Sequence, residues 1–179
     1  MVEQKLLQTF QPTFIINTSD CAEVPARITP GHSVPKVATT DGIIYGQVFP
    51  SVLGKNLVEI HDYTIWSKDC GRMDHPFDVE HVSALVCVGA SGSKTRYWYA
   101  GAHAGTVCDI SSGARAETVD AEFCSPVIWI SSGKHALCLR QETCRGGCGA
   151  DECAESVRLQ ANSAVANIGE LGAPANEAV

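Results

Sequence analysis

The sequence is poor in charge and in long apolar runs, and each shortage excludes a class of protein. Charged residues make up only 18% of the 179 residues, and acidic residues outnumber basic ones, which gives a net charge of −7. This balance is unfavourable for binding nucleic acid or anionic lipid, so no nucleic-acid partner is expected. No apolar run approaches the roughly 20 residues that cross a bilayer, so no transmembrane segment is predicted.

Several familiar motifs are also missing. The chain has no Gly-rich phosphate loop, no nucleophile elbow and no dinucleotide-binding fingerprint. Its first residues lack a basic segment followed by a long apolar stretch, so no signal peptide is visible. No nucleophile–base pair with recognisable spacing appears either, so the sequence favours a binding protein over an enzyme without deciding between them. Neither its natural ligand nor its oligomeric state follows from the sequence.

The sequence does contain a succession of short apolar segments separated by turns. A hydrophobic content of 45% is typical of a globular domain. The strand-like segments are 12–17, 43–49, 57–66, 79–88, 95–102, 127–130 and 136–139. They predict an all-β fold, namely a β-sandwich with long loops, followed by a short C-terminal helix at 151–159. We expect one domain over residues 1–159 and an irregular segment over residues 160–179.

Acidic and imidazole side chains gather between two of these strand-like segments. If a strand begins at Asp78, then Asp78 and Glu80 face the same side, because side chains alternate along a strand. His75 lies just before that strand, and Asp69 closes the preceding one within reach of the same point. Three carboxylates and one imidazole form a mostly hard ligand set, which predicts a site for Mg²⁺, Ca²⁺ or Mn²⁺.

The same residues also allow simpler interpretations. Asp69 and Asp78 are good turn residues, and Glu80 could pair with a lysine or arginine. A cation here could also be purely structural and tie two strands together. A metal-dependent hydrolase is a further alternative, with His103 or His135 handling protons. His103 could equally be the polar end of an aromatic strand, and His135 a turn residue, while a role in orienting a carboxylate is the functional alternative.

Nine cysteines are many for a chain of this length. The C-terminal cluster consists of Cys138, Cys144, Cys148 and Cys153. Its spacing lacks the paired Cys-x2-Cys of common zinc modules, so disulfides or packing are favoured over a metal site. The cysteine count also favours a secreted protein, because disulfides persist in oxidising compartments.

The segment around these acidic residues resembles a known family. Lys68 and Asp69 end a strand, and residues 74–80 read DHPFDVE. Lys-Asp followed by a Gly-His-Arg-His-Asp-Trp-Glu heptapeptide is the pattern of the necrosis-inducing (Nep1-like) proteins. His75, Asp78 and Glu80 match that heptapeptide, whereas Asp74, Pro76, Phe77 and Val79 depart from it. Segments 102–105, 133–136, 12–17 and 167–174 add a similarity to the family or to its relatives of the vacuolar protein sorting-associated protein 62 type.

The resemblance implies a β-sandwich with a divalent cation near one end. It maps the family's metal ligands onto Asp69, His75, Asp78 and Glu80. In necrosis-inducing members, the cation supports recognition of sphingolipid sugar headgroups and membrane damage. The resemblance therefore implies a glycosylated lipid or sugar headgroup as the partner, and it agrees with a secreted protein. The departures within the heptapeptide separate this sequence from the cytolytic members.

Overall fold

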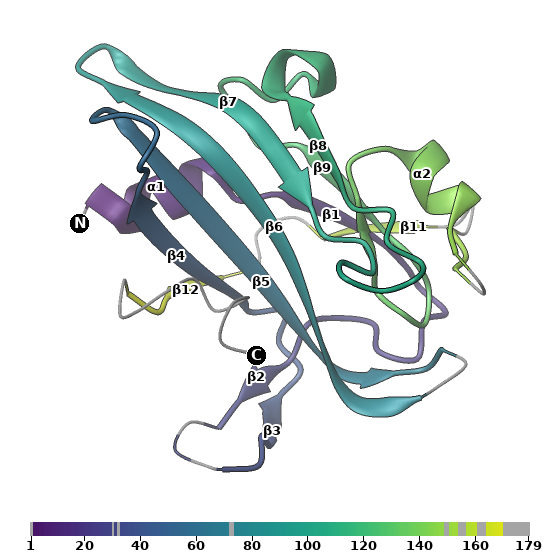
Figure 1. Cartoon of the computed structure of the whole chain (residues 1–179). Coiled ribbons are helices and arrows are strands. Elements are labelled where there is room, and N and C mark those ends of the chain that lie inside the picture. Colours follow the sequence, from purple (N-terminus) through teal and green to yellow (C-terminus); the bar gives the residue numbers. More distant parts are fainter. Residues whose placement is uncertain are drawn as a thin grey trace.

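A computed structural model of the chain shows two β-sheets packed face to face (Figure 1). It describes residues 2–29, 31, 33–71, 74–148, 151–153, 157–160 and 164–169, with the backbone alone described at 157–160. The elements are α1 (Val2–Phe10), β1 (Thr13–Asn17), β2 (Arg27–Ile28), β3 (Val37–Thr39), β4 (Ile44–Pro50), β5 (Leu57–Asp69), β6 (His75–Gly89), β7 (Gly92–Ala100), β8 (Ser112–Arg115), the 3-10 helix η1 (Ala116–Val119), β9 (Val127–Ile130), β10 (Leu137–Cys138), α2 (Gln141–Gly146), β11 (Val157–Gln160) and β12 (Val165–Asn167). The predicted all-β sandwich is confirmed.

The larger sheet has six strands in the order β12-β4-β5-β6-β7-β8. From β4 to β8 it is an antiparallel meander, and β12 adds to the edge of β4 in parallel. Alternation explains which face is buried: Ile60 and Trp66 of β5 and Val82 of β6 belong to the main core, while the residue directly before and after each of them faces the other way. The sequence predicted this alternation for β5 and β6.

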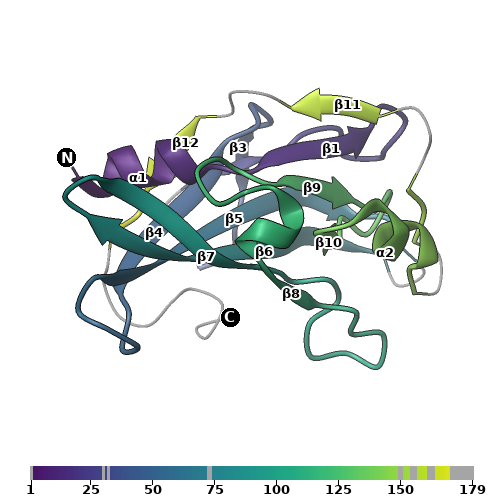
Figure 2. The same ribbon diagram turned by 90° about the horizontal axis from the view of Figure 1, so that it is seen from above.

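The smaller sheet is assembled from distant parts of the chain. Its order is β10-β9-β1-β11, with β1 parallel to β9 and antiparallel to β11. Figure 2 shows this sheet and α1 lying over one face of the larger sheet. Phe14 and Ile16 of β1 and Ile128 of β9 contribute to the shared core.

The N-terminal helix α1 was missed by the sequence analysis. Leu6, Leu7 and Phe10 are buried in the main core, at the spacing of one helical face. Leu7 packs against Gly46 of β4 so closely that a Cβ at Gly46 would meet its side chain at 2.5 Å. The glycine therefore allows the helix to approach the sheet.

The predicted helix at 151–159 is wrong. Val157–Gln160 forms strand β11, because it pairs with β1, and Glu152 makes an isolated bridge to Ser132. The short helix of this region is α2, which ends before Gly147. Part of the segment predicted to be irregular is also regular, since Val165–Asn167 forms β12. The remaining boundaries of the predicted domain stay a prediction, and 161–163 and 170–179 lie outside the described residues.

Three disulfides fasten the loops: Cys21–Cys70, Cys108–Cys148 and Cys144–Cys153. Of the predicted C-terminal cysteine cluster, Cys138 remains a buried free thiol, and the other three residues are in disulfides. Cysteines bonded in this way offer no thiolate to a metal, which removes the metal alternative for them. Three disulfides fit an extracellular protein. Within the described residues, no helix is long and apolar enough to cross a membrane.

Candidate functional site

A cavity of about 960 Å³ lies beside the long β5–β6 hairpin. All four residues predicted as cation ligands line it, and so do His103 and Lys134 from distant loops. These six are Asp69, His75, Asp78, Glu80, His103 and Lys134. The loop between β5 and β6 is shorter than predicted, so all four predicted ligands belong to strands and not to a loop.

Asp69 and His75 close the hairpin from opposite strands. They are cross-strand partners, and the His75 Nε2 atom lies 3.7 Å from Asp69 Oδ2. The His75 Nδ1 atom lies 2.8 Å from the backbone oxygen of Phe77, which has a positive φ of 63°. Asp69 Oδ1 accepts a hydrogen bond from the Gly71 amide, which fixes the carboxylate at the strand end.

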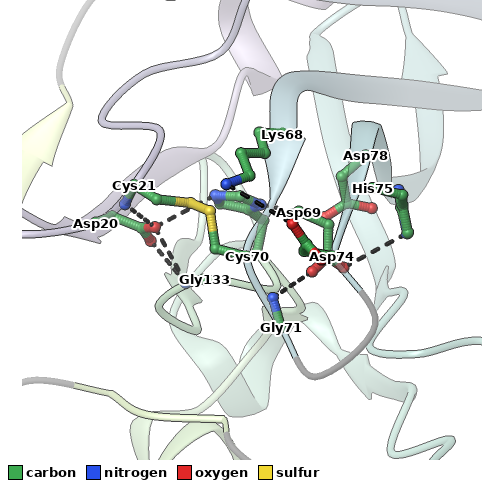
Figure 3. The surroundings of a disulfide bond; sticks show 11 residues. Asp20, Cys21, Lys68, Asp69, Cys70, Gly71, Asp74, His75, Asp78 and Gly133 are labelled. Carbon is green, nitrogen blue, oxygen red and sulfur yellow. Dashed lines mark hydrogen bonds and ion pairs between the residues drawn. A yellow bond between two sulfur atoms is a disulfide. The ribbon is translucent and has the colours of Figure 1, made fainter.

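Asp78 and Glu80 bring two more carboxylates to the same place. Burial raises the pKa of Glu80 well above its ordinary value, and the negative charges of Asp78, Asp151 and Asp69 raise it further. These four residues, Asp69, Asp78, Glu80 and Asp151, are called the carboxylate cluster below. Figure 3 shows Asp69, Asp78 and His75 together on one side of the Cys21–Cys70 disulfide. Such a concentration of negative charge favours a bound cation or proton.

His135 directly follows the turn at Gly133 and Lys134, and its buried side chain lies between two carboxylates. Its Nδ1 atom lies 3.1 Å from Asp78 Oδ2 and its Nε2 atom lies 3.5 Å from Asp20 Oδ1. Its ring stacks on Trp66 with the centroids 4.1 Å apart. Burial by itself lowers the pKa of His135, but hydrogen bonds and charge from Asp20 and Asp78 outweigh it and raise the pKa. His135 therefore orients Asp78 from behind.

His103 is held in a similar way on the other side of the cluster. Its Nε2 atom lies 2.6 Å from Asp151 Oδ2, and the same carboxylate oxygen accepts the Cys148 amide at 3.0 Å. Lys134 Nζ lies 3.6 Å from Asp151 Oδ1 and donates to the Cys148 carbonyl at 3.1 Å. Because His103 also lines the cavity, it is the histidine of the two that a ligand could reach.

The tightest group of metal-ligating atoms is not the predicted one. Among the described residues, only Asp20, Cys21 and His135 place three such atoms within 4.8 Å of one another. Cys21 is bonded to Cys70, so its sulfur cannot act as a thiolate ligand and this group offers two donors at most. No three of the predicted ligands meet the same spacing as the side chains stand in the structure. A cation would therefore have to draw them inward.

Sequence reasoning missed the residues that support the site from a distance. Asp20 is 115 residues from His135, and Asp151 is 48 residues from His103. Neither aspartate belongs to a local pattern with the residue it holds, so periodicity and spacing carry no signal of the pairing. Only the fold brings these residues together, and the Cys21–Cys70 disulfide joins the residues that follow Asp20 and Asp69.

The fold has counterparts among solved structures. No protein-family model matches the chain, and no curated protein matches it. A structure described as NLPPya in complex with glucosamine superposes with a TM-score of 0.55 at 18% identity, covering 77% of this chain and 68% of that one. NLPPya in complex with mannosamine gives 0.55 at 19% identity over the same shares. A structure described as a toxin fold for microbial attack and plant defense gives 0.52 at 15% identity, covering 75% and 66%. The likeness establishes a shared fold with Nep1-like proteins.

Proposed function

We propose that this protein, which has the fold of Nep1-like proteins, binds a sugar headgroup through a divalent cation held by Asp69, His75, Asp78 and Glu80. The observation that carries the proposal is that all four residues, selected from the sequence, line one cavity. The similarity to the vacuolar protein sorting-associated protein 62 type stays a prediction.

The donor set fits a hard divalent cation. Mg²⁺, Ca²⁺ and Mn²⁺ favour carboxylate oxygens, and three of the four donors are carboxylates. The raised pKa of Glu80 agrees with this, because the cluster holds more negative charge than its described neighbours offset. A bound cation would supply a Lewis-acidic centre that coordinates sugar hydroxyl groups. His135 would keep Asp78 turned toward it, and Asp69 and His75 would close it at the hairpin end.

Two structural neighbours support a sugar as the ligand. Structures of NLPPya are described in complex with glucosamine and with mannosamine, and both are amino sugars. We propose the same chemical class for this protein, because an amine and adjacent hydroxyl groups suit a cavity lined by carboxylates. A free glycan and a glycosylated lipid present the same headgroup. The disulfides support a secreted protein, which would meet either ligand outside a cell.

The proposal is tested by calorimetric titration of chelator-treated protein, first with Ca²⁺, Mg²⁺ and Mn²⁺ and then with glucosamine. We expect saturable cation binding, and glucosamine binding that requires the cation. Asp78→Asn should abolish both. Asp74→Asn is the matched control, because the Asp74 side chain is 70% exposed and lies in the same hairpin loop. Cation binding that survives Asp78→Asn, or glucosamine binding unaffected by chelator, would contradict the proposal. Vesicles with and without a glycosylated lipid then separate the two ligand sources.

The His103–Asp151 pair favours a second candidate function, which is metal-dependent hydrolysis. The 2.6 Å contact holds His103 at the wall of the cavity, where it could accept a proton. The test is turnover of bis-p-nitrophenyl phosphate in the presence of each cation. Cation-dependent turnover that is lost in His103→Ala would support this candidate. If the cation instead raises the melting temperature and no ligand binds, its role is purely structural.

A further inference from the structure

A smaller cavity of about 160 Å³ lies at the β8 edge of the larger sheet, where β8 ends and stops pairing with β7 (Figure 1). Three basic residues line it, Lys94, Arg96 and Arg115, together with Tyr97 and two glutamates. This cavity shares no lining residue with the cavity beside the β5–β6 hairpin, which reaches the opposite end of β7. The two cavities are therefore separate sites.

A β-bulge in β7 brings the basic side chains together. The register of β6 against β7 shifts at Arg96, which has no partner in the described pairing. Because of this shift, Lys94 and Tyr97 are opposite two residues of β6 that lie two apart, so both face the same side of the sheet. Arg115 of β8 is the cross-strand partner of Tyr97 and faces that side as well. A regular strand would place Lys94 and Tyr97 on opposite sides.

Two of the three cations are held in position by neighbouring side chains. Lys94 Nζ lies 2.5 Å from Glu122 Oε1. The Arg115 guanidinium donates to Glu117, with 3.4 Å between Nη1 and Oε1, and also to Tyr97; both contacts raise the pKa of Arg115. The side chains of Arg115 and Glu117 are 65% and 57% exposed, so this ion pair is weak. Arg115 is therefore oriented but still open to a further anion.

Arg96 gives the cavity a positive charge that no carboxylate offsets. Its side chain is exposed, and it makes no ion pair or hydrogen bond within the described part of the chain. Three basic side chains and two glutamates leave the cavity with one surplus positive charge, although the whole protein has a net charge of −7. A locally positive cavity on an acidic protein is a feature that favours an anion over a cation.

The donor set and the size of the cavity indicate the class of anion. Guanidinium groups make paired, charge-assisted hydrogen bonds to oxyanions, and three separate cations match the several oxygens of sulfate or phosphate better than the two of a carboxylate. The volume is below the roughly 300 Å³ of pockets that enclose a drug-sized ligand, so it suits a single charged group.

We infer that Lys94, Arg96 and Arg115 bind a tetrahedral oxyanion, sulfate or phosphate, at this edge of the larger sheet. The anion is either the free ion or a monoester group of a larger molecule that extends into solvent. The inference goes beyond the proposed function, because the site needs neither the divalent cation nor a sugar.

The test is an NMR titration of protein that has been treated with chelator and dialysed. Sodium sulfate and sodium phosphate are added separately, at an ionic strength held constant with sodium chloride. We expect saturable shifts of the Nε–Hε signals of Arg96 and Arg115. Arg96→Gln and Arg115→Gln should each weaken sulfate binding by about tenfold or more, because each removes a charge-assisted hydrogen bond. Glu117→Gln should tighten it by roughly threefold, because it removes a competing carboxylate.

Arg145→Gln is the matched control. It removes the same charge from an exposed arginine of α2 that does not line the cavity, so it should keep the wild-type affinity. A parallel titration with p-nitrophenyl sulfate distinguishes the two sources of the anion. Binding at least as tight as that of inorganic sulfate would assign the site to a sulfate or phosphate ester, and loss of binding would assign it to the free ion.

Three results would overturn the inference. The first is shifts no larger than those caused by sodium chloride alone. The second is sulfate binding that is equal in the wild type, Arg96→Gln and Arg115→Gln. The third is equal weakening by Arg145→Gln, which would show a general effect of net charge. Asp78→Asn should leave sulfate binding unchanged, so failure of the proposed cation site and failure of the anion site are distinguishable.

Discussion

The cavity has two kinds of lining, the carboxylate cluster and a set of aliphatic and tyrosine side chains, and the pKa values of the histidines beside them are shifted in opposite directions. The second set, called the apolar wall, consists of Ile28, Tyr45, Tyr63, Ile65, Val79 and Tyr99. His135 lies between Asp20 and Asp78, which raise its pKa, whereas His81 stacks on Tyr63 beside His61 and has a pKa of about 3. Both rings are largely removed from solvent, so burial alone does not explain the difference. The neighbouring groups determine the direction of the pKa shift, because carboxylates stabilise the charged ring, whereas aromatic rings and a second imidazole do not.

The two linings also differ in how the chain builds them. The apolar wall comes mostly from neighbouring strands of one meander. The carboxylate cluster depends on Asp20, Asp151 and His135, which are far from β5 and β6 in the sequence. We therefore expect the carboxylate side to be the more sensitive to single changes, and the predictions below test that expectation.

The largest effect is expected at His135. His135→Ala would leave Asp20 and Asp78 without their shared partner and would remove the stack on Trp66. Removing one member of a buried ion pair costs about 3–5 kcal/mol, so the free energy of unfolding should fall by that amount in urea titrations. His75→Ala is the control, since its side chain is 53% exposed and should cost less than about 0.5 kcal/mol. If both variants lost the same free energy of unfolding, the prediction that the buried His135 stabilises the fold more than the exposed His75 would be wrong.

The next largest effect is expected at the disulfide beside the carboxylate cluster. Replacing Cys21 and Cys70 with alanine opens a link across a sequence separation of 49, and should lower stability by about 2–4 kcal/mol. The same replacement of Cys144 and Cys153 opens a link across a separation of 9. Loop-closure entropy alone would make the first loss larger by about 1.5 kcal/mol. Chemical denaturation of both double variants measures the two stability losses. A larger loss in the Cys144 and Cys153 variant would show that native packing outweighs the loop-closure entropy.

Substitution of Asp62, a fully buried carboxyl outside the cavity, is expected to raise the free energy of unfolding, by less than the preceding variants lower it. Neither of its oxygens has a hydrogen-bond partner among the described residues, and burial raises its pKa well above the ordinary value. Asp62→Val should therefore stabilise the fold at pH 7 by about 1–3 kcal/mol.

The pH dependence at Asp62 has a definite sign. Because the folded-state pKa is the higher one, the unfolded chain loses its proton first as pH rises. The pH-dependent part of the free-energy cost of burying the Asp62 carboxyl is absent below about pH 3.9. It grows above that pH until the raised pKa is reached. Thermal melts of Asp62→Val and wild type should converge near pH 3.5 and separate toward pH 7. Parallel curves would mean that folding leaves the pKa of Asp62 unchanged, which would contradict the raised pKa.

The smallest effect is expected at His81 and concerns the pH dependence of its NMR signals. Its imidazole resonances should stay in place from pH 8 down to about pH 4, because its pKa is about 3. The unfolded chain takes up a proton near pH 6.5, so this group should make the fold progressively less stable as pH falls below that value. Two-dimensional NMR of the six histidines, with His81→Gln for assignment, checks both statements. A His81 signal that titrates near pH 6.5 would place a charge on the apolar wall.

The sequence predicted the parts of the fold that depend on local pattern. Alternation along β5 and β6 gave the correct strands, and residues 69–80 gave side chains that share a cavity. These features follow from the period of a strand, which is visible in a single segment.

The wrong and missed sequence predictions have physical reasons. The acidic residues near 151 suggested a helix, but pairing with β1 makes Val157–Gln160 a strand, which shows tertiary contact outweighing local preference. The short helix α1 shows only one apolar face, and its stability comes from packing under the larger sheet. The positions of Asp20 and Asp151 depend on chain crossings that no local pattern contains.

The parallel pairing of β1 with β9 has a consequence for how the chain acquires its structure. Thr13 is paired with Val127, and β11 completes the same small sheet from residues 157–160. The meander from β4 to β8 can form from neighbours, whereas the small sheet must close loops of more than a hundred residues, which slows folding. During synthesis on the ribosome, the hairpin bearing Asp69 and His75 would therefore form before the strand that gives His135 its place. The cavity beside the β5–β6 hairpin would be among the last features of the molecule to form.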